Sequence, residues 1–293
     1  MGSRKKWWFI ISGIVILPGF ISLFTWGLRW GIDFKGGTLY EVKIKKEEVK
    51  IAEVRETLKP LNLPDLTVIS TGPSTFLLKT AQIEQEKVDE IKETLKSKFG
   101  ETEEIRYETV GPVVGKDLKK KAIWAISLAC LFIILYIAWA FRNVPKPQSS
   151  FKFGISAIAA LIHDVLVVLG TFSIIGHFLG YEADAYLITA ILTVLGFSVH
   201  DTIVVFDRIR ENLKRLPGIN FETVANESVI QTLTRSINTS LTVILTLLAL
   251  FLLGGETIKP FVLALLIGIT TGTYSSIFNA TPLLVVWQRR VKS

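Results

Sequence analysis

The chain has 293 residues, of which 49% are hydrophobic, and its mean hydropathy is +0.45. This composition is too apolar for an ordinary soluble domain and indicates a membrane protein. The formal net charge is +7, but the basic residues are scattered among expected helix ends, which argues against a nucleic-acid-binding protein. The single cysteine, Cys130, excludes a disulfide within the chain, and no metal-ligand spacing appears.

Six stretches of the sequence are long and apolar enough to cross a bilayer, since a spanning helix needs about 20 apolar residues. They cover residues 7–27, 121–141, 152–175, 185–207, 236–254 and 260–287. The first stretch is longer than a signal-peptide core and no small-residue cleavage site follows it, so we expect an uncleaved anchor. We expect the last stretch to be tilted, or kinked near Gly268, Gly272 or Pro282.

The distribution of basic residues predicts the orientation, because loops rich in Lys and Arg stay in the cytoplasm. Basic residues occur at both termini, including Arg4, Arg290 and Lys292. They also occur in the loop 142–152, including Lys146, and in the segment 208–235, whereas the loop 176–184 has none. Both termini are therefore expected in the cytoplasm. The predicted parts are a first helix in 1–27, an external domain in 28–120 and a five-helix region in 121–293. We expect its cytoplasmic segment 208–235 to be a short amphipathic element near the membrane surface.

The external segment has the periodicity of a small α+β domain. Its expected strands and helices, in chain order, are Thr38–Ile44, helix Glu47–Leu58, Leu66–Ser70, Thr75–Lys79, helix Gln82–Phe99 and Glu103–Val110. The order βαββαβ is that of a ferredoxin-like domain. The predicted fold is thus a polytopic α-helical membrane protein with six transmembrane helices and a ferredoxin-like external domain between helices 1 and 2.

Asp201 lies within the apolar stretch 187–206, next to His200. A charge near the bilayer centre costs about 3 kcal/mol on insertion scales, so intramembrane ionisable residues usually mark ion or proton paths. Burial favours the neutral carboxyl and a nearby cation favours the carboxylate, so a carboxyl balanced between the two can load and release protons. Arg235, at the start of the next helix, is the expected cation. The alternative is an ion pair that only fixes helix packing.

His163 and Asp164 form a second ionisable pair, inside the third apolar stretch. Adjacent helical residues point about 100° apart, so both side chains are not expected to face one groove fully. Asp164 is a second candidate for proton relay, and the alternative is a polar knot that bonds to a neighbouring helix. The last two helices are rich in Ser and Thr, which suit close packing or a wet path.

No catalytic signature is present. The glycine-rich turn at residues 31–38, GIDFKGGT, lacks the spacing of a phosphate-binding loop. No nucleophile elbow appears either. We therefore expect no enzymatic activity and no cofactor, with energy supplied by an ion gradient or a partner.

Two strings of the sequence carry a resemblance to a known family. GIDFKGGT after the first helix and GFSVHDTIVVFDRIREN at residues 196–212 resemble the SecF protein-export membrane family, over essentially the whole chain. One departure is visible, because His200 stands where that family typically has asparagine. A second titratable group therefore lies beside Asp201.

The resemblance implies a partner and an energy source. Proteins of this family pair with SecD as a twelve-helix transporter of the resistance-nodulation-division type. They associate with the SecYEG translocon and use the proton-motive force to help draw unfolded polypeptides across the bacterial inner (plasma) membrane. The resemblance places Asp201 and Arg235 in the proton path, puts residues 28–120 on the periplasmic side, and assigns that domain a part in large conformational motions.

Two other functions remain open from the sequence. One is a stand-alone proton-coupled exporter of lipids or small molecules, which needs a homodimer because six helices make half of a pseudo-symmetric unit. The other is a scaffold for the translocon without transport of its own. The size of the native complex and export by an Asp201→Asn, Arg235→Ala variant separate these possibilities.

Overall fold

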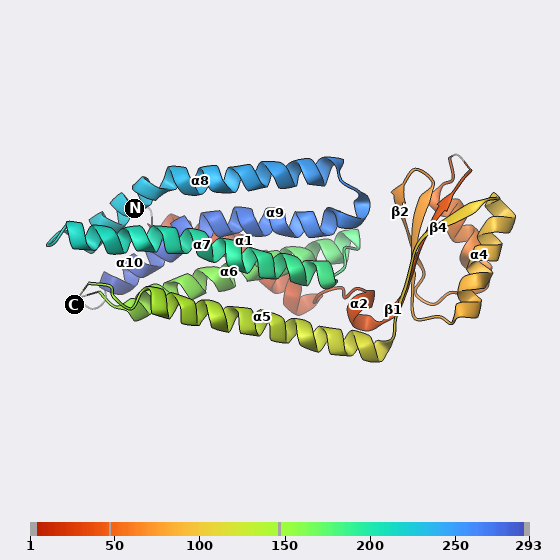
Figure 1. Cartoon of the computed structure of the whole chain (residues 1–293), viewed down its shortest axis with the longest axis horizontal. Helices are drawn as coiled ribbons and strands as arrows, with labels where there is room; N and C mark the ends of the chain where they lie inside the picture. Colours follow the sequence, from red (N-terminus) through yellow and green to blue (C-terminus); the bar gives the residue numbers. More distant parts are fainter. Residues whose placement is uncertain (1–4, 47, 146–147, 290–293) are drawn as a thin grey trace.

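A computed structural model of the chain describes residues 5–46, 48–145 and 148–289. Four basic residues that contribute to the predicted orientation, Arg4, Lys146, Arg290 and Lys292, lie outside these ranges. Figure 1 shows a long helical bundle with a small sheet domain at one end. Both chain termini lie at the opposite end of the bundle, close to the turn between α7 (Ala185–Arg215) and α8 (Phe221–Leu253).

Within the described ranges, six helical segments are long and apolar enough to cross a membrane. They are α1 (Lys5–Thr25), α5 (Pro112–Ala140), α6 (Ser150–Leu179), α7 (Ala185–Arg215), α8 (Phe221–Leu253) and a last run of α9 (Lys259–Ser275), a π-helix (Ser276–Ala280) and α10 (Thr281–Arg289). The π-helix ends two residues before Pro282, whose ring would clash with the carbonyl of Phe278, four residues earlier, in a regular α-helix. The extra residue per turn accommodates that proline, within the region where a kink is expected.

The bundle helices differ from the prediction at α5 and in the segment 208–235. Helix α5 begins at Pro112 rather than at residue 121, because proline is suited to the first helical position and the polar residues that follow continue the helix. The segment 208–235 is not a separate surface element. Its first residues continue α7 to Arg215 and its last residues belong to α8, which begins at Phe221. Apolar length marks the thickness of the bilayer and does not mark where a helix ends.

The sheet domain has four strands and two main helices. In chain order they are β1 (Gly37–Ile44), α3 (Ile51–Leu58), β2 (Thr67–Gly72), β3 (Thr75–Thr80), α4 (Gln85–Phe99) and β4 (Thr102–Val110). The strand order is β2-β3-β1-β4 and every neighbouring pair is antiparallel. Alternate residues such as Tyr40, Val42, Phe76 and Leu78 pack against α3 and α4 in one core. Figure 1 shows α4 on the side of the sheet remote from the bundle, so the other sheet face is turned toward the bundle.

The glycine-rich turn forms the junction between bundle and sheet. It contains the short helix α2 (Ile32–Lys35), followed by Gly36 and Gly37 with φ of 83° and 153°. A Cβ on Gly37 would lie 2.7 Å from the Thr80 carbonyl oxygen, and a Cβ on Gly115 of α5 would lie 2.9 Å from the Gly36 nitrogen. The residues are glycine because backbones from three segments meet here.

The same junction is bonded to the loop between α6 and α7. Ala183 donates its N–H to the Arg29 carbonyl at 2.6 Å, and Gly31 donates to the Ala183 carbonyl at 2.9 Å. The Asp33 carboxylate accepts the N–H of Ala185, the first residue of α7, at 2.8 Å. The entry to the sheet domain is therefore fixed to the beginning of α7.

Glycines also set the helix packing inside the bundle. A Cβ on Gly268 of α9 would overlap the Val194 side chain of α7, and a Cβ on Gly272 would lie 2.9 Å from the Cβ of Ser198 on α7. Gly19 of α1 and Gly170 of α6 approach each other with their backbones in contact. Small residues let membrane helices approach closely, and here they hold α9 against the helix that carries Asp201.

Candidate functional site

Asp164 lies at the point where α6, α7 and α9 meet, and its side chain is fully buried. Its Oδ2 accepts hydrogen bonds from the Ser198 hydroxyl of α7 at 2.5 Å and from the Ser275 hydroxyl of α9 at 2.7 Å. The close packing of Gly272 on Ser198 brings these hydroxyls to the carboxyl. Asp164 is therefore held by donors from two other helices.

His163 shares this site with Asp164. Its Nδ1 lies 3.0 Å from the Asp164 Oδ1, although adjacent helical residues diverge in direction. The second ring nitrogen, Nε2, is buried and has no hydrogen-bond partner among the described residues. The structure thus brings the predicted pair together and leaves one imidazole nitrogen available for a proton or a water molecule.

Asp201 of α7 is 2% exposed, and its side chain faces α8 and α9, on the other side of α9 from Asp164. The Ser240 hydroxyl of α8 lies 3.4 Å from its Oδ2, and the Thr273 hydroxyl of α9 donates to Ser240 at 2.6 Å. Ser236, one turn before Ser240, is also buried. The carboxyl of Asp201 is therefore surrounded by hydroxyl groups rather than by a cation.

Hydroxyl groups also occupy the space between α7 and α9 near the two carboxyls. The Thr202 and Ser276 hydroxyls lie 2.8 Å apart, and Ser276 donates to the Ser198 carbonyl at 3.2 Å. A hydroxyl both donates and accepts a hydrogen bond, so such groups can pass a proton along a chain. Thr273 and Ser275, two residues apart on α9, bond toward Asp201 and Asp164 respectively.

Arg235 and His200 form no hydrogen bond or ion pair with either buried carboxyl among the residues that the structure describes, although His200 directly precedes Asp201 on α7. Both are exposed on the outer surface of the bundle, and in the part of the chain that the structure describes no ion pair joins Arg235 to Asp201. The expected Asp201–Arg235 pair is therefore not formed in this structure. The hydroxyls of Ser198, Ser240 and Ser275 contact the carboxyls instead. Sequence reasoning noted the abundance of hydroxyls in the last helices but missed Ser198, whose only signal is its place between Val194 and Thr202 at helical spacing.

Arg235 belongs to a polar surface that we call the α7–α8 polar face. Its members are exposed and recur every three or four residues along each helix: Thr189, Thr193, Gly196 and His200 on α7, and Arg235, Asn238, Thr239, Thr242 and Thr246 on α8. Several of the threonines bond to carbonyls of their own helix, whereas Arg235, Asn238 and His200 are costly groups to place against lipid.

The outer surface of α5 provides a contrast. Its exposed side chains are large and apolar, as lipid contact requires: Ile123, Trp124, Leu128, Leu131, Phe132 and Leu135. The difference between the two surfaces indicates that α5 faces lipid and that the α7–α8 polar face does not.

Comparison with known proteins identifies the family. Residues 90–290 match the family model described as "Protein export membrane protein SecD/SecF, C-terminal", and residues 21–48 match the "SecD/SecF GG Motif". The second range contains Gly36 and Gly37 of the junction. Among curated relatives, the "Protein translocase subunit SecF" of Thermobaculum terrenum is 49% identical, with 96% of this chain and 92% of that protein covered. That of Anaerolinea thermophila is 44% identical, with 98% and 93% covered.

Two solved structures are also similar. The first is SecDF, a translocon-associated membrane protein from Thermus thermophilus, with a TM-score of 0.85, 33% identity and 98% of this chain covered. The second is SecDF in a super-membrane-facing form, with a TM-score of 0.69, 32% identity and 99% covered. This chain spans only 38% of either SecDF chain. With the full-length agreement to SecF proteins, these matches show that the chain belongs to the SecD/SecF family of protein export membrane proteins.

Proposed function

We propose that this protein is a SecF-type subunit that pairs with a SecD subunit and uses the proton-motive force to assist polypeptide export through SecYEG. The observation that carries the proposal is a pair of buried carboxyls, Asp164 and Asp201, on two sides of one hydroxyl-rich helix. Buried carboxyls are retained in a membrane bundle at a high cost in free energy, which favours a role in ion coupling. No enzymatic activity and no cofactor belong to this function.

The partner is expected on the α7–α8 polar face. SecDF of Thermus thermophilus is a longer chain of which this chain matches 38%, and we propose that a SecD subunit corresponds to the part that is not matched. A second helical bundle docked on the polar face would cover Arg235, Asn238 and His200 with protein instead of lipid. The resulting twelve-helix assembly is the one that the SecF resemblance implies.

The proposed mechanism rests on the charge of Asp201. When its carboxyl is ionised it attracts a cation such as Arg235, and when it is protonated that attraction is lost. Moving one charge through 100 mV yields about 2.3 kcal/mol, which is enough to shift a balanced helix arrangement substantially. His200 lies beside Asp201 and adds a second titratable group there. Asp164 and His163 are proposed as a second position on the same proton path.

The proposal includes the location of the parts. The protein is a multi-pass protein of the bacterial inner membrane with both termini cytoplasmic and residues 28–120 outside. This is supported by the position of the termini and of the basic α7–α8 turn at the bundle end remote from the sheet (Figure 1). We assign the sheet domain to the ferredoxin-like class, supported by its element order and by the strand order β2-β3-β1-β4.

The experiment that tests this function uses inverted membrane vesicles that contain the protein with SecD and SecYEG. Asp201→Asn is expected to abolish the stimulation of export by the proton-motive force while leaving co-purification with SecD intact. Asp207→Asn, an exposed carboxylate on the same helix, is the matched control and is expected to export normally. Full stimulation in the Asp201 variant would remove this carboxyl from the mechanism and favour a scaffold.

A further inference from the structure

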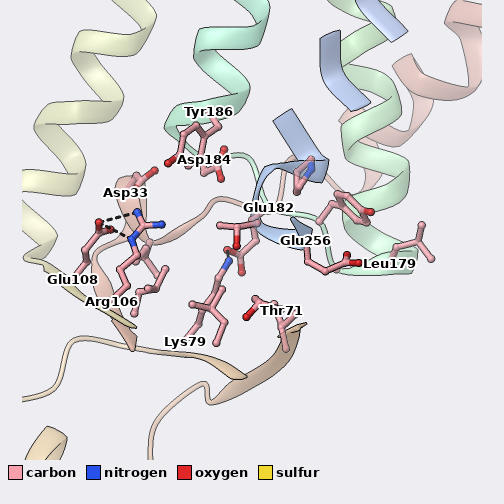
Figure 2. Close-up of a pocket in the computed structure, with 18 residues that line it drawn as sticks. Asp33, Thr71, Lys79, Arg106, Glu108, Leu179, Glu182, Asp184, Tyr186 and Glu256 are labelled. Carbon is pink, nitrogen blue, oxygen red and sulfur yellow. Dashed lines mark hydrogen bonds and ion pairs between the residues drawn. The ribbon is translucent and has the colours of Figure 1, made fainter. Parts of the chain in front are cut away.

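A cleft with a volume of about 350 Å³ lies between the sheet domain and the bundle (Figure 2). One wall is the bundle-facing side of the sheet, to which all four strands contribute, and the other is formed by α2, the α6–α7 loop and the start of α9. Its volume falls within the range of about 300–1,000 Å³ that is typical of ligand sites.

The sheet wall of this cleft is apolar at its centre. Leu39, Ile69 and Leu77 come from three neighbouring strands and alternate with the residues that form the domain core on the other side. Leu179 and Pro260 add apolar surface from the bundle side. Ile69 remains 38% exposed, so the space between the walls is not filled by the protein's own side chains.

The rim of the cleft is acidic. Five carboxylates line it, against the two basic side chains Lys79 and Arg106: Asp33, Glu108, Glu182, Asp184 and Glu256. Both basic groups are already engaged, because Lys79 pairs with Glu182 at 2.8 Å and Arg106 pairs with Glu108 at 2.7 Å. A surplus of negative charge is therefore left for a ligand.

Asp33 and Asp184 hold that surplus. The remaining carboxylate, Glu256, pairs with Lys259 at 2.5 Å. Asp33 accepts the Ala185 N–H and Asp184 accepts the Leu187 N–H at 3.0 Å, so both carboxylates gather at the first turn of α7. Burial raises the pKa of Asp184, and the negative charge of Asp33 raises it further. Neither forms an ion pair in the described part of the chain, so a positive group placed between them would relieve their repulsion.

We propose that this cleft binds a short extended polypeptide segment in which a basic side chain lies next to apolar side chains. The apolar side chains would contact Leu39, Ile69 and Leu77, and the basic group would reach Asp33 and Asp184. A polypeptide fits better than a lipid because a folded sheet, rather than a bilayer, forms one wall. The inference rests on the proposed function, since an exported chain is the source of such a segment.

The test measures peptide binding to the full-length protein in nanodiscs of phosphatidylcholine. The probe is a short fluorescent peptide in which leucine and lysine alternate, and its counterpart carries glutamate in place of lysine. Fluorescence anisotropy is expected to show binding of the lysine peptide at least tenfold tighter than of the glutamate peptide. In Asp33→Asn, Asp184→Asn, which keeps both side-chain acceptors, affinity for the lysine peptide should fall roughly tenfold.

The matched control removes two carboxylates from the opposite side of the same domain. Glu86→Gln, Glu93→Gln lies on the exposed surface of α4 and is expected to bind like the wild type. Ile69→Ser tests the apolar wall and should weaken binding of the same peptide. Equal binding by all variants, or equal binding to protein-free nanodiscs, would overturn the proposal and assign the signal to the lipid surface.

This experiment is separable from the export assay. If neither the wild type nor any variant binds the lysine peptide while export still depends on Asp201, the cleft is not a peptide-binding site and the proposed function stands. If the cleft variants weaken peptide binding but Asp201→Asn exports normally, the cleft is a peptide-binding site and proton coupling through Asp201 is refuted.

Discussion

Ser198 and Ser275 each place a hydroxyl on the buried carboxyl of Asp164, from α7 and α9 respectively. A carboxyl that accepts two such bonds keeps part of the solvation that it loses on burial. At the scale of single residues, the site is therefore a small set of hydroxyl donors whose positions depend on how closely two helices approach.

Removing one of these donors should lower stability measurably. Ser275→Ala is expected to reduce the free energy of unfolding by about 1 kcal/mol, because a buried acceptor loses one of its partners. Ser127→Ala is the control, since the Ser127 hydroxyl is exposed and bonds only to a carbonyl of its own helix. Thermal unfolding of both variants in the same detergent compares them, and equal losses would contradict a specific role for Ser275.

Asp184 gives a prediction for pH. Burial raises its pKa in the folded protein above the usual 3.8. The folded state thus binds the proton more tightly than the unfolded state, and this contribution to stability is present below the unfolded pKa and is lost as pH rises through the folded pKa.

Asp184→Asn keeps the cap of α7 and should lack this part of the pH dependence. Denaturation curves from about pH 3 to 7 for both proteins give the difference. If the difference in stability between the wild type and this variant does not change with pH, the pKa of Asp184 is not raised in the folded protein.

At the scale of elements, the junction at Gly36 and Gly37 depends on the absence of side chains. Gly37→Ala should destabilise the domain by about 1–3 kcal/mol, because its φ is positive and a Cβ would meet the Thr80 carbonyl. Gly13→Ala in α1, where a Cβ meets nothing within 4 Å, should be neutral or slightly stabilising. Limited proteolysis of residues 37–110 in membranes reports the loss, and equal resistance of both variants would refute it.

Much of the element layout was predictable, since apolar length and strand alternation identify spans and strands directly. Predicted strand Thr75–Lys79 and observed β3 (Thr75–Thr80) differ by one residue. The contacts of Asp164 were not predictable, because they depend on how α6, α7 and α9 cross. The exposure of Arg235 was not predictable either, since a single sequence does not say which helix face a partner chain will cover.

At the scale of the whole molecule, the α7–α8 polar face predicts where a partner binds. The double variant Asn238→Leu, Thr242→Leu should reduce recovery of co-expressed SecD several-fold. The two leucines cannot form hydrogen bonds to a partner helix, and their larger side chains hinder its close approach. Leu131→Ala on the lipid-facing side of α5 is the control and should leave recovery unchanged. Pull-down at matched expression levels measures the effect, and undiminished recovery with the polar-face variant would place the partner elsewhere.

Only Gly111 separates the last strand, β4, from α5. The helix has 29 residues and is about 43 Å long at 1.5 Å per residue. Because one residue separates the two elements, a change in the tilt of α5 would be passed directly to β4 and so to the sheet. Backbone hydrogen bonds hold Arg29 and Gly31, in the segment that links α1 to β1, to Ala183, so such a tilt would change the width of the cleft between the sheet and the bundle.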